Sequence, residues 1–484
     1  MEKNIFRVAF PHRRPASDYD PVKIPYASHY FFLQNIYSPL VEYSLNGELV
    51  SAIAEKFQWI GTEAHFKIRP GLQTIDGDKI DANDVAKSFK RLFMIGGNTH
   101  GDLKRMLCPG VELHNLNDVC PGMSVSSDGS EFVLKFKERK IFLFPMLAAM
   151  DFAVIPAKAI DPKTLKITEY RNTSGPYYVS KDDVNGHIEF AANPRHFHYS
   201  DKIPQDWGFV VPKDGDSVDS LKLFTAGEVD HLTTKDSSDW EKIKYAHEHK
   251  EVVLHQSLPL NLNALVFTER GLKRFSETER IAIAKKLKAL FLARYSVRPG
   301  YGAVEQLIPV FGEGGLSPEQ LSELNKKFNA VKDAEVFDKP FTCWNYFGAE
   351  DATLEKHFPK GKFIWTNSIP DFTDSKKQKW DAPDFYLFRG DTGFQEDVGF
   401  IFYYFSMNFF EIKESDKKKW LDKYLSTESK KERIEMLQYL HYKTILNAKV
   451  FPVAIESYSA IVRKPWQFSF SKYHASNQIW RIHQ

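Results

Sequence analysis

The stretch that decides the fold runs from residue 36 to residue 93 and reads IYSPLVEYSLNGELVSAIAEKFQWIGTEAHFKIRPGLQTIDGDKIDANDVAKSFKRLF. Its Asn46-Gly47 pair is the dipeptide most typical of a tight hairpin turn. Residues 64–69 alternate apolar and polar side chains with a period of two, which predicts a half-buried strand. Pro70-Gly71 and Asp76-Gly77 then turn the chain again. Together these signals predict a small β-rich unit.

A helix follows this unit, and its start can be located from the sequence. Asp81 is the expected N-cap, and Asp84 stands at the third helical position, where a carboxylate suits the positive helix end. Val85, Phe89 and Leu92 then fall on one face of the helix. We therefore expect a compact β-rich module that is closed by this helix.

Helix starts are also marked in the second half of the chain. Ser276 and Ser429 each stand three residues before a glutamate, which is the pattern of a capping box. Ser317 precedes a proline at the first helical position. Residues 257–267 instead read as a strand, and we expect it to cross into another lobe.

Length and composition limit the class of protein. With 484 residues the chain is too long for one ordinary core, so two or three lobes are expected. The 39 Phe, 21 Tyr and 9 Trp fit large cores or aromatic-lined ligand cavities. The formal net charge is +2 and no long block of like charge occurs, so no nucleic-acid partner is indicated.

The chain contains no run of about 18 uncharged apolar residues, so no transmembrane helix is expected. Its first residues also lack the apolar core of a signal peptide. Either the chain is cytosolic or a signal was removed before Met1.

Signatures of enzymes and of metal sites are missing. The sequence has no G-x-S-x-G, H-E-x-x-H, P-loop or G-x-G-x-x-G pattern, so we expect no catalytic residue and no cofactor. A hydrolase that assembles its site from scattered residues remains an alternative. His196 and His198 could share one face of an extended segment, but no third ligand is marked, so no metal site is predicted.

Three cysteines are present. Cys108 and Cys120 stand twelve residues apart in a segment that contains Gly, Pro and Asn, and a disulfide between them would suit an oxidising compartment. Two unrelated thiols are the alternative. Cys343 stands alone.

The order of the segments within residues 36–93 resembles the family 5 extracytoplasmic solute-binding proteins. These are the oligopeptide-, dipeptide- and nickel-binding receptors of ABC importers. The positions that fall into register with the family pattern are Tyr37, Pro39, Leu40, Val41, Tyr43, Gly47, Leu49, Ala54, Glu55, Phe66, Ile68, Arg69, Gly71, Asp76, Gly77, Ala82, Asp84, Val85, Ser88 and Arg91. Further matches extend the resemblance over nearly the full length, in residues 172–179, 193–199, 220–230 and 451–466.

The resemblance implies an α/β fold of the periplasmic-binding-protein type II-like class, with two α/β lobes joined by hinge strands plus an extra α+β domain. It implies the following division of the chain. Lobe I is discontinuous and comprises residues 1–44, 170–257 and 459–484. The extra domain II covers 45–169, and lobe III covers 258–458.

The resemblance also suggests where a ligand binds. In peptide-binding members, a W-x-x-D-Y-x-x-P segment pairs its backbone with the peptide, and its aspartate holds the α-ammonium of the peptide. Phe388 and Asp391 match the Trp and Asp positions of this pattern, and Gly390 lies between them. Arg389 could meet a ligand carboxylate. The match fails at Thr392, where the family has Tyr.

Because of this departure, Glu396 or Asp397 could hold the ligand cation in place of Asp391. A second region, Ile24 to Ser28, matches the family segment that lies along the bound peptide, so Tyr26 and Ala27 are ligand-binding candidates. An ordinary aromatic-bearing loop is the alternative for that region.

The function implied is that of a periplasmic or extracellular receptor that closes two lobes on a peptide for uptake by an ABC permease. The permease would be a transient partner, and the receptor a monomer. A nickel chelate, a sugar or a murein peptide is the alternative ligand within the same fold.

Overall fold

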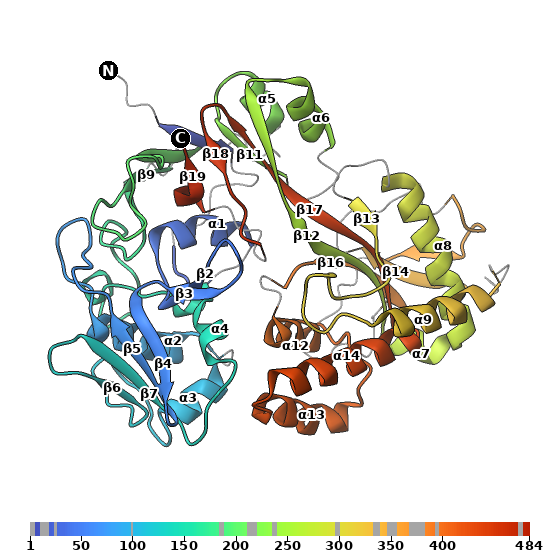
Figure 1. Ribbon diagram of the computed structural model, residues 1–484, viewed down its shortest axis with the longest axis horizontal. Coiled ribbons are helices and arrows are strands. Elements are labelled where there is room, and N and C mark those ends of the chain that lie inside the picture. The colour runs from blue at the N-terminus through green and yellow to red at the C-terminus, as the bar shows by residue number, and fades with distance from the viewer. Residues whose placement is uncertain are drawn as a thin grey trace.

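In the computed structural model, the described residues are 5–9, 19–23, 27–97, 100–182, 188–210, 220–234, 240–295, 301–332, 339–345, 356–366, 383–392, 396–472 and 478–484. Two halves stand on either side of the view in Figure 1. The left half contains residues up to 210 and residues 467–484, and the right half contains residues 262–456.

One mixed sheet runs through both halves. Among the described residues it has eleven strands, in the order β15-β14-β16-β12-β17-β11-β1-β10-β9-β8, with β13 also paired to β17. Their bounds are β1 Phe6–Ala9, β8 Tyr177–Asp182, β9 Ile188–Ala192, β10 Asp206–Val210, β11 His231–Thr234, β12 Val252–Phe267, β13 Tyr301–Ala303, β14 Phe341–Asn345, β15 Phe363–Trp365, β16 Phe385–Gly390 and β17 Val450–Arg463.

The two long strands β12 and β17 connect the halves (Figure 1). Near one end, β11 pairs with residues 459–462 of β17. Near the other, β16 pairs with residues 262–267 of β12. Between these regions the ladder shifts register at Pro259, which lies opposite Ser457. The expected strand at 257–267 is thus confirmed, and it belongs to a ladder that continues from one half into the other.

The unit that the opening stretch predicted is present in the left half. The hairpin of β2 (Val41–Tyr43) and β3 (Leu49–Ser51) turns at Gly47, whose φ is 80°. A separate sheet has the order β4-β5-β7-β6, with β4 Ala54–Ile60, β5 Glu63–Ile68, β7 Glu131–Lys135 and β6 Met123–Val125. Side chains of β5 alternate between buried and more exposed, as predicted.

The helix that closes this unit is α2 (Ala82–Ile95). Asp81 is its N-cap, and Asp84 completes a reciprocal capping box, so the predicted start is confirmed. The other helices of the left half are α1 Ala27–Ile36, α3 Gly101–Leu107 and α4 Leu143–Leu147. Two short strands, β18 Gln467–Phe468 and β19 Ile482–His483, bring the C-terminal residues back to this half.

The remaining helices flank the central strands and the right half. Their bounds are α5 Ser220–Thr225, α6 Trp240–Glu248, α7 Glu269–Arg274, α8 Glu277–Tyr295, α9 Pro318–Ala330, α12 Asp397–Ser406, α13 Glu414–Ser426 and α14 Lys430–Leu446. The predicted cap residues Ser276, Ser317 and Ser429 each accept a hydrogen bond from the backbone N–H three residues later. All three helix starts are therefore confirmed.

Cys108 and Cys120 form a disulfide, which decides between the two alternatives left by the sequence. Both residues are buried in the core of the left half, beside α2 and the four-stranded sheet. Cys343 is buried and is not disulfide-bonded.

A buried ion pair ties the N-terminal turn to α2. Arg91 is fully buried, and Asp20 is 1% exposed. The guanidinium donates from Nη1 at 2.9 Å and from Nη2 at 2.5 Å to the two carboxylate oxygens, while Nε donates to the Leu165 carbonyl at 2.7 Å. All three nitrogens of this guanidinium thus donate hydrogen bonds. If either Arg91 or Asp20 were removed, the other would remain as an uncompensated buried charge.

We therefore predict that Arg91→Met lowers the free energy of unfolding by about 3–5 kcal/mol, because it strands the Asp20 carboxylate in the interior. Urea denaturation followed by circular dichroism measures this loss. Arg105→Met is the matched control, since Arg105 pairs with Asp102 on the surface, where the two side chains are 74% and 80% exposed. Equal effects of the two substitutions would contradict the prediction.

Candidate functional site

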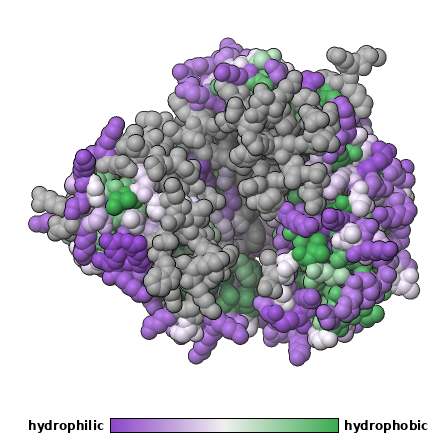
Figure 2. Space-filling model, turned by 180° about the vertical axis from the view of Figure 1, so that it is seen from behind, coloured by the Kyte–Doolittle hydropathy of each residue, from purple (hydrophilic) through white to green (hydrophobic). Residues whose placement is uncertain are grey.

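The surface is hollowed between the two halves, as the view from behind shows (Figure 2). The sequence-predicted binding residues belong to a segment of the right half. It begins at the end of β16, where Gly390 pairs with Leu262 of β12, and it continues through Asp391 and Thr392. Described structure resumes at Glu396, just before α12. The sequence-predicted binding residues Phe388 to Asp391 lie at the start of this segment.

Arg389 is held by the strand that joins the halves. Its Nη2 lies 3.2 Å from Oε2 of Glu456 on β17, and the two side chains are 11% and 5% exposed. Asn263 of β12 donates from Nδ2 to Oε1 of the same glutamate at 2.5 Å. Burial lowers the pKa of Arg389, and the nearby carboxylates of Glu456 and Asp391 oppose that shift. Arg389 is therefore a buried cation that lies near two anions.

Asp391 lies beside the same strand. It is half-buried, and the hydroxyl of Tyr458 on β17 donates a hydrogen bond to its carboxylate. Burial and the negative charge of Asp391 raise the pKa of Tyr458 well above its usual range, so this phenol stays a hydrogen-bond donor. The Asp391 carboxylate is thus oriented by the connecting strand.

Phe388 and Gly390 shape the strand from within the right half. Phe388 is buried in the hydrophobic core, where its ring packs edge-on against Phe409 at 4.7 Å between centroids. A Cβ on Gly390 would collide with the hydroxyl of Tyr403 and approach the Phe388 ring to 2.9 Å. Position 390 therefore has no room for a side chain, and glycine is required there.

The other candidate region is described only in part. Tyr26 lies outside the described residues, and Ala27 begins α1. Asp397, one alternative to Asp391, is buried inside the right half, where it accepts hydrogen bonds from Tyr424 at 2.6 Å and from Arg433 at 2.8 Å. Its carboxylate is thus engaged by its own lobe.

Two contacts join the halves on the side of the hollow away from the connecting strands. Glu396 interacts with the hydroxyl of Tyr43 at the end of β2. The rings of Phe142 and Phe402 meet edge-on, with centroids 5.8 Å apart. We call these two contacts the latch. Asp391 thus lies beside the connecting strand, whereas Glu396 lies at the latch.

Glu396 has an unusual protonation equilibrium. Burial raises its pKa to about 7, and the neighbouring Glu313 and Asp397 also raise it, while Lys430 and Tyr43 lower it. Near neutral pH this carboxyl therefore exchanges between its neutral and charged forms.

Sequence reasoning missed Glu456, Tyr458 and both latch contacts. Glu456 and Tyr458 lie two apart on β17, so they share one face of that strand. Arg389 and Asp391 are also two residues apart. This matching spacing was a signal that could have indicated the pairing of the two segments. The latch residues carry no local pattern, because Tyr43 and Glu396 meet only when the halves come together.

His196 and His198 serve the structure of the left half. Nε2 of His196 lies 3.1 Å from the Ser38 hydroxyl, and its Nδ1 accepts the backbone N–H of His198. Nε2 of His198 lies 2.8 Å from Glu42. Burial keeps the pKa of His196 well below its usual range, so it is neutral. No group of three metal-binding side chains occurs in the part of the chain that the structure describes.

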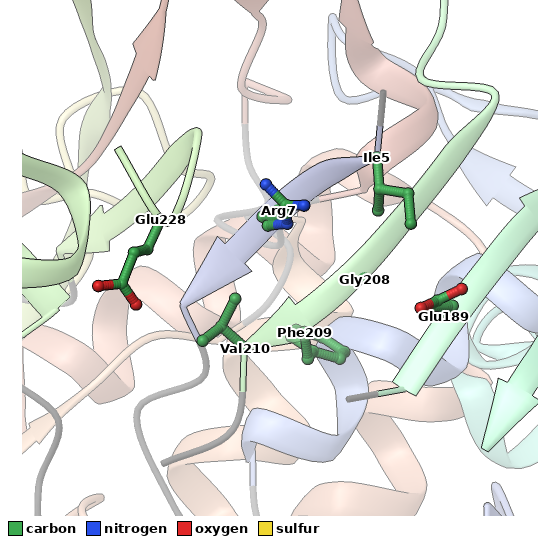
Figure 3. Close-up of a pocket in the computed structure, with 7 residues that line it drawn as sticks. All are labelled: Ile5, Arg7, Glu189, Gly208, Phe209, Val210 and Glu228. Carbon is green, nitrogen blue, oxygen red and sulfur yellow. The ribbon is translucent and has the colours of Figure 1, made fainter. Parts of the chain in front are cut away.

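A pocket of about 320 Å³ lies elsewhere, on β1, β9 and β10 of the left half (Figure 3). Among the described residues that line it, Arg7 is the one cation, and in the view it lies between Glu228 and Glu189. The residues that line it are Ile5, Arg7, Glu189, Gly208, Phe209, Val210 and Glu228. All of them precede β11, so this pocket does not involve the right half.

Comparison with known proteins identifies the fold. The profile of the family described as bacterial extracellular solute-binding proteins, family 5 Middle, matches residues 48–284. No curated protein sequence matches the chain.

Three solved structures are similar over almost the whole length. NikA from Brucella suis in complex with Fe(III)-EDTA has 14% identity and a TM-score of 0.76, with 99% of each chain covered. The ABC transporter-associated periplasmic binding protein DppA from Helicobacter pylori, in complex with a peptide, has 14% identity and a TM-score of 0.71, with 99% of this chain and 98% of that chain covered. OppA from Haemophilus influenzae in complex with the peptide RPPGFSPFR has 15% identity and a TM-score of 0.68, with 100% and 99% covered.

Two α/β halves joined by long strands, with an additional small sheet, define the fold of the periplasmic binding proteins of type II. The profile match to family 5 of the bacterial extracellular solute-binding proteins agrees with the resemblance seen in the sequence. That family is described as one of solute-binding proteins. Among the described residues, no helix is both long and apolar enough to cross a membrane.

From the raised pKa of Glu396 in the latch, we predict that the separation of the two halves depends on pH. When the halves separate, Glu396 meets water and its pKa falls from about 7 toward its ordinary 4.5, so closure takes up a proton. The latch is then fully stabilising below pH 4.5 and weakens as the pH rises through about 7. We expect small-angle X-ray scattering to show a more open protein at pH 8 than at pH 5.5.

Glu396→Gln mimics the protonated carboxyl and is expected to remove this dependence. Glu435→Gln, at an exposed glutamate of α14, is the control and should behave as the unsubstituted protein. If Glu396→Gln opens with rising pH as before, the prediction is wrong.

Proposed function

We propose that this receptor binds peptides between its two lobes and presents them to an ABC permease. The observation that carries the proposal is the position of Asp391. Its half-buried carboxylate follows the end of β16 directly and is oriented by Tyr458 of the connecting strand. A carboxylate so placed suits the α-ammonium of a peptide.

The proposed mechanism is closure of two lobes about β12 and β17. A ligand favours the closed state only if it contacts both lobes, because it must bind that state more tightly. Asp391 would anchor the ligand on lobe III, with Phe388 and Gly390 fixing the strand beneath it. Tyr26 and Ala27 would contribute from lobe I.

For the lobes we propose the division 1–44, 170–257 and 459–484 for lobe I, 45–169 for domain II, and 258–458 for lobe III. Separate hydrophobic cores support it. Ile155 and Ile160 pack in the core of lobe I, which favours an end of domain II nearer residue 154.

We further propose that the protein acts as a monomer in the periplasm or outside the cell, with a transient permease partner and no enzymatic activity. The buried Cys108–Cys120 disulfide fits an oxidising compartment. A nickel chelate, sugar or murein peptide is the alternative ligand, because Thr392 departs from the peptide-binding pattern.

Native mass spectrometry of the purified protein, followed by denaturation, tests the ligand class. We expect released peptides of a narrow length range, and re-added peptide should be recovered intact, since a receptor does not consume its ligand. Asp391→Asn should weaken rebinding about 10-fold or more, as expected for loss of a charge-assisted anchor. A released metal chelate or sugar, or no thermal shift with a mixed peptide library, would refute the peptide proposal.

A further inference from the structure

We propose that the C-terminal segment is a strap that fixes Tyr43 in the latch, and that Arg481 is the positioning residue through which it does so. The strap comprises residues 467–472 and 478–484, the described parts of the chain from β18 onward. The inference goes beyond the proposed function, because it does not depend on which ligand binds.

The strap starts at the end of the ladder where β11 pairs with β17. β18 begins four residues after β17 ends at Arg463, so the strap continues from that strand almost directly. The backbone N–H of Phe468 donates to Nε2 of His255 on β12 at 3.3 Å. Phe468 is itself buried in the core of the left half. The strap is therefore attached to both connecting strands.

Farther along, the strap holds the hairpin of β2 and β3. Three successive carbonyls of this hairpin accept hydrogen bonds from the strap. The three pairs of acceptor and donor are Tyr43 with Nη2 of Arg481 at 2.9 Å, Ser44 with Oγ of Ser471 at 2.9 Å, and Leu45 with the backbone N–H of Lys472 at 2.6 Å. Because all three acceptors are backbone groups, these bonds fix the course of the chain at the end of β2.

A second set of contacts holds the residue before Tyr43. The ring of Trp480 stacks on His198, with centroids 3.8 Å apart and an angle of 8° between the ring planes. Nε2 of His198 lies 2.8 Å from Oε1 of Glu42. The guanidinium of Arg481 lies over the Trp480 ring, 4.9 Å from its centroid. Two neighbouring residues of the strap thus act on two neighbouring residues of β2.

Arg481 itself is poorly suited to a purely stabilising role. Its side chain is buried, and its Nε and Nη1 have no hydrogen-bond partner among the described residues. Burial lowers the pKa of Arg481 to about 10, and the nearby Glu42 carboxylate opposes that shift. Buried donors without an acceptor are costly, so an apolar side chain of similar length should cost the fold little. What such a substitution removes is the hydrogen bond to Tyr43.

Tyr43 is the point where the strap meets the latch. Its carbonyl is bound by Arg481, and its hydroxyl interacts with Glu396 of the facing half. If the backbone at Tyr43 were loose, closure would have to order it each time, which costs conformational entropy. The strap orders it before the halves meet. Closure at the latch therefore depends on a segment that starts at the connecting strands.

Arg481→Met tests the inference, because it keeps an unbranched side chain and removes the donor to the Tyr43 carbonyl. Small-angle X-ray scattering at pH 5.5, fitted as a mixture of closed and open shapes, gives the ratio of the two states. We expect this substitution to lower the ratio of closed to open molecules about 5-fold, as for the loss of one hydrogen bond. Arg105→Met, at an exposed arginine of α3, is the matched control and should leave the ratio unchanged.

Tyr43→Phe separates a positioning role from a general structural one. It removes the hydroxyl that meets Glu396, so it should open the protein by itself. If Arg481 acts through Tyr43, adding Arg481→Met to Tyr43→Phe opens the protein no further. A ratio that falls by the product of the two single effects overturns the inference.

Ser471→Ala guards against a folding defect in Arg481→Met. Ser471 is buried, and the substitution removes its hydrogen bond to the Ser44 carbonyl without adding bulk. We expect it to lower the ratio in the same direction. An unchanged ratio in a folded Arg481→Met overturns the inference, and so does an unchanged ratio in Ser471→Ala if Arg481→Met does not fold. An unsubstituted protein that is open at pH 5.5 also overturns it, but leaves the proposed function standing.

Discussion

The ladder between β12 and β17 is the constraint on which the rest of the structure depends. Each of these strands belongs to both halves of the molecule, and their backbone groups pair from Val252 to Val266, with register shifts on both sides of Pro259 and between Asn263 and Ala264. Buried N–H and C=O groups must stay paired, so the halves cannot separate along this ladder. They can pivot only where the pairing is irregular. Closure of a cleft is therefore built into a single pair of strands.

The latch gives the opposite boundary of the same cleft. Asp391 contacts Tyr458 of the ladder, and Glu396, a few residues later in the sequence, contacts Tyr43 of the facing half. A ligand bound as proposed would change the balance between open and closed states only by contacting both halves. Protonation of Glu396 acts on the same balance from the latch side.

Buried ion pairs occur at two kinds of place in this protein, and their surroundings distinguish their roles. Asp20 with Arg91 joins two segments within one lobe, and its charges cancel. Arg389 with Glu456 has Asp391 as a third charged member and lies beside the cleft. Removing one member of either pair would leave an uncompensated buried charge.

The sequence by itself determined the local structure and the family. The Asn46-Gly47 hairpin, the alternating strand at 64–69 and the caps at Asp81, Ser276, Ser317 and Ser429 all formed as predicted, because turns, caps and periodicity depend on neighbours within a few residues. Tertiary structure alone decided the partner of Arg389, the pairing of Asp397 with Arg433, and the meeting of Tyr43 with Glu396. These contacts join residues that are 36 to more than 300 positions apart, and no local pattern records which distant charge will be buried beside which other.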